Sequence, residues 1–85
     1  MNTLICEYPS LAIEGERIRV EQTSHGCFCL CRLDRRGRRI PAMTMQISGS
    51  AAASHLLMAR KHAACGEDVV VGEMVTPPVR RWRDE

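Results

Sequence analysis

The chain has 85 residues and a formal net charge of +2, and it is 45% hydrophobic and 26% charged. Such a composition is typical of one small soluble domain, which buries only about 60% of the surface that its unfolded chain exposes, so we treat residues 1–85 as a single domain and expect a homo-oligomer. No apolar run approaches the roughly 20 residues that cross a bilayer, and no secretory signal is present, so we expect no membrane contact and a cytoplasmic location.

The N-terminal half alternates apolar and polar residues, which is typical of half-buried β-strands. Turn-forming clusters separate these runs, and Asp34-Arg35-Arg36-Gly37 has Asp first and Gly last, as a type I turn prefers. Pro41 lacks a backbone donor, so the strand that returns from this turn should lie at an edge of the sheet or start late. The strands predicted here span residues 3–8, 17–21, 27–33 and 38–46.

One helix is predicted over Ala51–Cys65, where Ala52, Leu56, Ala59 and Ala63 recur at helical spacing. Ser48 is a suitable N-cap and Gly66 stands where a helix commonly ends. A valine-rich strand should follow at residues 69–75, and residues 77–85 should form a flexible basic tail or a last short strand.

The order of these elements predicts an α+β fold. We expect a small antiparallel sheet or an OB-like barrel of four to five strands, with one α-helix between the third and fourth main strands. Whether the strands close into a barrel or leave an open sheet stays undecided from the pattern alone.

The cysteine-rich strand, CFCLCRL, should be buried on both faces. Cys27, Cys29 and Cys31 alternate with Phe28 and Leu30, so the two sets point to opposite sides. Five cysteines form no even framework, which favours free thiols in a reducing compartment. The C-x-C-x-C spacing does not match the turns that usually bind zinc, so we interpret these cysteines as core residues.

A weaker metal hypothesis concerns the helix. Four soft ligands fall on one helical stripe, and two of them, His62 and Cys65, could form half of a site. The whole stripe is too long for one ion at 1.5 Å of rise per residue, so packing explains it better. Its members are His55, Met58, His62 and Cys65.

Arginine is concentrated in the C-terminal two thirds of the chain. Residues 32–83 carry ten Lys and Arg side chains against four Asp and Glu, a net charge of +6. Like charges repel at a hairpin tip, and phosphate binding would give them a purpose because it releases counterions. In the tail, Trp82 could stack on a base while its neighbours hold the backbone. The candidate nucleic-acid-binding residues are Arg35, Arg36, Arg38, Arg39, Arg80, Arg81, Trp82 and Arg83.

The C-terminal stretch GEDVVVGEMVTPPVRRWRDE, residues 66–85, resembles the end of bacterial single-stranded DNA-binding proteins. The opening MNTLI and the Gly26 that precedes Cys27–Leu33 are loosely similar to that family and to its short relative, primosomal replication protein N. The resemblance implies an oligomeric OB-fold that binds single-stranded DNA, with Arg80, Arg81 and Trp82 near the path of the strand. The chain departs from that family in having few aromatic residues and no long acidic tail.

Three functions follow as hypotheses. The first is a small non-enzymatic nucleic-acid-binding module, with single-stranded DNA as the favoured ligand. The second is an interaction protein of a phage or mobile element that binds an acidic surface of a host protein. The third and weakest is a metal-handling protein. No G-x-S-x-G, H-E-x-x-H or glycine-rich phosphate loop occurs, so we expect no enzyme and no cofactor.

Overall fold

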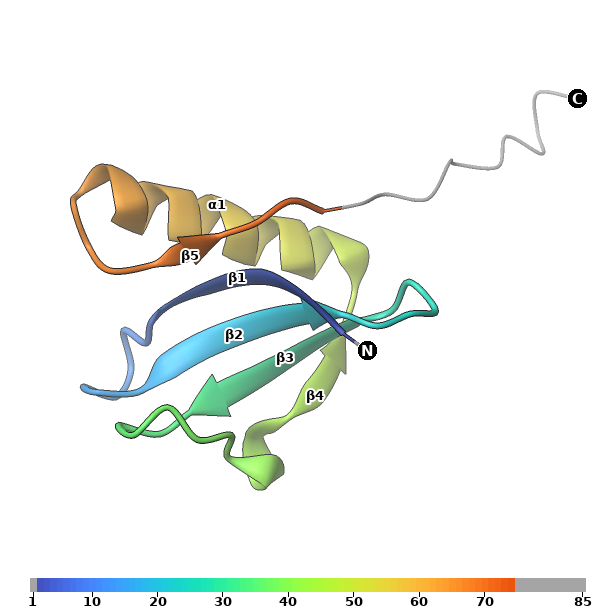
Figure 1. Ribbon diagram of the computed structural model, residues 1–85, viewed down its shortest axis with the longest axis horizontal. Helices are drawn as coiled ribbons and strands as arrows, with labels where there is room; N and C mark the ends of the chain where they lie inside the picture. Colours follow the sequence, from blue (N-terminus) through green and yellow to red (C-terminus); the bar gives the residue numbers. More distant parts are fainter. Residues whose placement is uncertain (1, 75–85) are drawn as a thin grey trace, which may run out of the picture.

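The computed structural model describes residues 2–74. Three consecutive strands form an antiparallel meander, and a short strand pairs with each edge of it (Figure 1). The sheet order is β4-β3-β2-β1-β5, and every neighbouring pair is antiparallel. Within the described residues β4 and β5 lie at opposite edges of an open sheet. The strands are β1 (Thr3–Pro9), β2 (Arg17–Gln22), β3 (Phe28–Leu33), β4 (Met45–Ile47) and β5 (Val70–Val71).

The α+β class and the small antiparallel sheet are confirmed, but the predicted position of the helix was wrong. Helix α1 (Gly49–Ala64) lies between β4 and β5 rather than between the third and fourth strands. The strand that returns from the hairpin, predicted over residues 38–46, counts as a full strand of the sheet although it is much shorter than predicted. Arg39 makes a single bridge to Leu33, then the 3₁₀ turn η1 (Pro41–Met43) interrupts the pairing, as proline favours, and β4 resumes it as a separate fourth strand.

Helix α1 begins and ends close to where its capping residues predict. The Ser48 hydroxyl accepts a hydrogen bond from the backbone N–H of Ala51 at 3.1 Å, which is an N-cap contact. Gly66 follows the helix with a φ of +81°, a conformation that glycine adopts readily. The helix covers one face of the sheet along β1 and β5, and its buried residues are Ala52, Leu56, Ala59 and His62.

The core lies between α1 and the inner face of the sheet, the face toward the helix. Phe28 belongs to this core and Leu30 packs against it, whereas Cys29 and Cys31 alternate onto the outer face. Cys31 is buried, Cys29 is half-buried and Cys27 is exposed, so the prediction of burial on both faces holds only for part of β3. All five cysteines are free thiols. The core residues are Ile5, Cys6, Tyr8, Val20, Phe28, Ala52, Leu56 and Ala59.

Strand β1 pairs with β2 on one side and with β5 on the other, and it contains a β-bulge at Ile5 that affects the hydrogen bonds on both sides. Leu4 pairs with Glu21 and Cys6 with Val20, so Ile5 is the extra residue. The carbonyl oxygen of Ile5 instead accepts the N–H of Gly72 at 2.7 Å. A Cβ atom at Gly72 would lie 2.8 Å from the carbonyl oxygens of Leu4 and Ile5, which explains a glycine at this close approach.

The last predicted strand, residues 69–75, is observed as β5 alone, and position 75 lies outside the described residues. Among residues 2–74 no helix is long and apolar enough to cross a bilayer.

Candidate nucleic-acid interface

The hairpin between β3 and β4 is built around the side chain of Asp34. Its Oδ1 accepts the backbone N–H groups of Arg36 and Arg38, each at 2.9 Å, and the N–H of Gly37 donates to the Asp34 carbonyl at 2.9 Å. The backbone hydrogen bond from Arg38 is the largest influence on the pKa of Asp34. Desolvation opposes it, but the further contacts with Arg36 and Arg38 leave the pKa lowered. The predicted turn is therefore present, and an ionised carboxylate fixes its shape.

The four arginines of this hairpin fall into two pairs with different surroundings. Arg38 Nε contacts Asp34 Oδ2 at 3.1 Å, and Arg39 Nη2 contacts both carboxylate oxygens of Glu21 at 2.9 and 3.0 Å. Arg35 and Arg36 are exposed and form no ion pair with any residue in the range 2–74. Of the four hairpin arginines, Arg35 and Arg36 are thus the ones most available to an outside anion.

Arg39 is the last member of a chain of ion pairs across the outer face of the sheet. Glu7 contacts Arg17 at 2.6 Å and Arg19 at 2.8 Å, and Arg19 also approaches Glu21 at 3.8 Å. The Glu7 and Glu21 side chains are only 12% and 10% exposed, so their charges need these partners. We call Glu7, Arg17, Arg19, Glu21 and Arg39 the charge ladder, and it fastens the base of the hairpin to the sheet.

The pKa of Glu7 reflects the same contacts. Burial raises the pKa of this carboxyl, but the hydrogen bonds and positive charges of Arg17 and Arg19 together outweigh burial, so the net effect is a lowered pKa. The ladder holds three arginines against two carboxylates, and its Arg39 is paired with Glu21, so Arg39 is less available to an outside phosphate than the sequence alone suggested. The predicted tail residues Arg80, Arg81, Trp82 and Arg83 lie outside the described residues.

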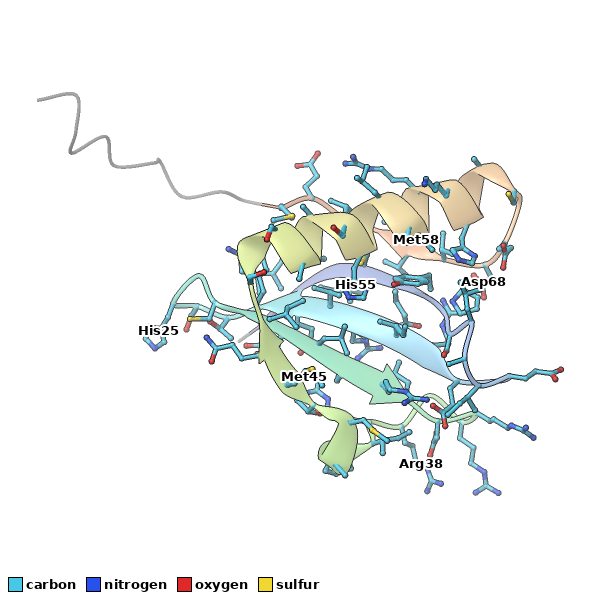
Figure 2. The ribbon with its side chains drawn as sticks, turned by 180° about the vertical axis from the view of Figure 1, so that it is seen from behind. His25, Arg38, Met45, His55, Met58 and Asp68 are labelled. Atoms are coloured by element: carbon cyan, nitrogen blue, oxygen red, sulfur yellow. The ribbon has the colours of Figure 1, made fainter. Side chains whose placement is uncertain are left out.

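The two histidines of the predicted soft-ligand stripe on α1 have polar partners that periodicity could not reveal, whereas Cys65 at the end of the stripe is exposed. Tyr8 Oη lies 2.6 Å from His55 Nδ1, and the Tyr8 ring stacks on His62 with 5.4 Å between ring centroids. His62 Nδ1 in turn lies 2.8 Å from Glu67 Oε2. Figure 2 shows His55 between α1 and the sheet. Across the described part of the chain, no three His, Cys, Asp or Glu side chains gather as metal ligands would.

His55 should make the stability of the protein depend on pH. Burial lowers the pKa of His55, so the folded protein binds fewer protons here than the unfolded chain does. The contribution of this histidine is therefore fully present above its ordinary pKa of about 6.5 and is lost as the pH falls through the lower folded value. Urea unfolding followed by circular dichroism, from about pH 7.5 down to about pH 5, should show a declining free energy of unfolding.

Two variants test whether His55 causes the decline in the free energy of unfolding. His55→Gln should flatten the stability curve in this range, whereas His25→Gln, at an exposed turn position, should leave it unchanged. An unaltered decline in the His55 variant would show that another group is responsible. Glu7 acts in the same direction but at lower pH, since the lowered pKa of a carboxyl affects stability only in the acidic range.

No family model matches the chain, and comparisons with curated proteins and with solved structures found no significant match. The resemblance to single-stranded DNA-binding proteins therefore stays a prediction, and the argument for function depends on the side chains of the hairpin.

Proposed function

We propose that the protein is a non-enzymatic module that binds the phosphate backbone of nucleic acid through Arg35, Arg36 and Arg38, which we call the arginine tip. The observation that supports it most is the exposure of Arg35 and Arg36 without a carboxylate partner among residues 2–74. The planar guanidinium group matches phosphate geometry, and two such groups on a fixed turn can face successive phosphates.

The expected affinity is modest and strongly dependent on salt. Each phosphate that the tip neutralises releases condensed counterions, and the slope of log K against log salt is about −0.7 per phosphate on a single strand. Arg38 contributes less than the other two because Asp34 already pairs with it. Two phosphates held by Arg35 and Arg36 would give a slope of about −1.4.

Fluorescence anisotropy of a labelled oligonucleotide, titrated with protein at low and moderate salt, tests the proposal. We expect R35A/R36A to weaken binding at low salt by about tenfold or more and to remove most of the salt dependence. The matched control is R60A/K61A, which removes the same charge from exposed positions on α1 and should change the affinity by less than about twofold. Undetectable binding of the wild-type protein at low ionic strength, or equal loss in both variants, would overturn the proposal.

An acidic surface of a host protein is the second candidate, because the guanidinium groups of Arg35 and Arg36 match the geometry of a carboxylate as well as that of a phosphate. Polyglutamate added to the same titration separates the candidates. Tight binding of polyglutamate that is lost in R35A/R36A, without binding of oligonucleotide, would favour the protein partner. Self-association and a cytoplasmic location stay predictions.

A further inference from the structure

The loop between β1 and β2, residues 10–16, holds two apolar side chains out in solvent. Leu11 is 76% exposed, the highest value among the large apolar residues of the described chain, and Ile13 is 42% exposed. The loop backbone is well hydrogen-bonded. Ser10 Oγ accepts the N–H groups of Ala12 and Ile13 at 3.2 and 3.3 Å, and the Ser10 N–H donates to the Glu16 carbonyl at 2.9 Å. These contacts hold the loop in a shape that keeps Leu11 and Ile13 away from the core.

This loop lies directly beside the arginine tip. A Cβ atom at Gly15 would be 2.7 to 3.0 Å from side-chain atoms of Arg35, so the Arg35 stem packs over the loop backbone at that point. Below this contact, Arg32 Nη2 and Glu16 Oε1 form an ion pair of 2.6 Å between β3 and the loop. Both loops extend from the same end of the sheet in Figure 1, and Figure 2 shows Arg38 at the end opposite His25.

We propose that Leu11 and Ile13 contact unpaired bases of a single strand whose phosphates are held by the arginine tip. This inference rests on the proposed function and deepens it, because it assigns selectivity for single strands to two residues that carry no charge. Arginines alone hold the phosphates of a duplex and of a single strand alike. A duplex stacks its base faces inside, whereas a single strand exposes them to apolar side chains.

The charges around the loop restrict how a strand can pass. Glu14 is exposed beside Ile13 and has no cation within the described part of the chain, so it repels phosphate on its own side of the loop. The backbone of a bound strand should therefore follow Arg35 and Arg36, with its bases turned toward Leu11 and Ile13. A protein segment would need a wider desolvated area than two isolated aliphatic side chains provide, which makes it the less suitable occupant.

Three labelled ligands of equal length test the inference in the anisotropy assay. They are oligothymidylate, an abasic strand with the same phosphates, and a hairpin duplex. We expect L11S/I13S to weaken oligothymidylate binding by about tenfold, since two aliphatic contacts that the bases would partly bury in the complex are lost. Binding of the abasic strand and of the duplex should stay within about twofold of wild type. Leu57→Ser, at a 55% exposed position on α1, is the control for loss of surface apolarity and should match wild type.

The variants also distinguish failure of this inference from failure of the proposed function. If R35A/R36A loses binding but L11S/I13S binds oligothymidylate as wild type does, the assignment of the loop is overturned and the arginine tip stands. If L11S/I13S weakens binding of the duplex as much as binding of the single strand, the two residues do not distinguish the ligands and the selectivity for single strands is overturned. If wild type binds none of the three ligands, the proposed function itself fails. Circular dichroism checks that both variants fold.

Discussion

Replacement of Leu56 by alanine is expected to lower the free energy of unfolding by about 2–5 kcal/mol, the range for truncation of a buried leucine. Leu56 is 5% exposed and lies on the face of α1 that meets the core, between the fully buried Ala52 and Ala59. The side chains of those two alanines are too short to fill the cavity that the truncation leaves. For a small domain whose total stability is roughly 5–15 kcal/mol, the loss brings the variant close to unfolding.

Urea denaturation followed by circular dichroism measures this effect, and the adjacent residue supplies the control. Leu57 is 55% exposed on the same helix, so Leu57→Ala should change the free energy of unfolding by no more than about 0.5 kcal/mol. Equal destabilisation in the two variants would contradict the arrangement of α1 on the sheet.

Replacement of Glu21 by glutamine is expected to cost about 1–2 kcal/mol of stability, because it removes the charge that holds three neighbours. The Glu21 side chain is 10% exposed and accepts Arg39 and Asn2, while Arg19 lies at 3.8 Å. The arginines are 31% and 44% exposed and can turn toward water, so the loss is smaller than for a fully buried pair.

Glu14→Gln removes the same charge from an exposed loop position and should leave stability within about 0.5 kcal/mol of wild type. If both variants are equally stable, the charge ladder does not fasten the hairpin. Under the proposed function, Glu21→Gln also releases Arg39 for phosphate contact, so affinity for nucleic acid should rise while stability falls.

Much of the backbone could be predicted from local signals. The period-2 pattern around Ile18 and Val20 located β2, and Ser48 with Gly66 located both ends of α1, because such signals act between neighbours in the chain. Pro41 correctly indicated that the returning strand would be an edge strand that starts late. The pattern did not show that pairing would stop for η1 and resume as β4, since that depends on where β3 offers free backbone groups.

The candidate site was less predictable because it depends on long-range partners. The four hairpin arginines look equivalent in sequence, and only the fold brings Glu21 to Arg39 while leaving Arg36 free of any carboxylate among residues 2–74. Tyr8 and His55 likewise meet across 47 positions of the chain. Leu11 and Ile13 alternate as strand residues do, and nothing local indicates that both belong to an exposed loop beside the tip.

The bulge at Ile5 has a consequence for how the sheet tolerates change in chain length. Because Ile5 is skipped by β2, the two successive residues Ile5 and Cys6 are both fully buried. Removing one residue between Thr3 and Cys6 would restore a regular ladder to β2, but it would withdraw the carbonyl that Gly72 uses. The register of β1 is therefore set by β2 and β5 together. An insertion or deletion in β1 that preserved the pairing with one of these strands would disrupt the pairing with the other.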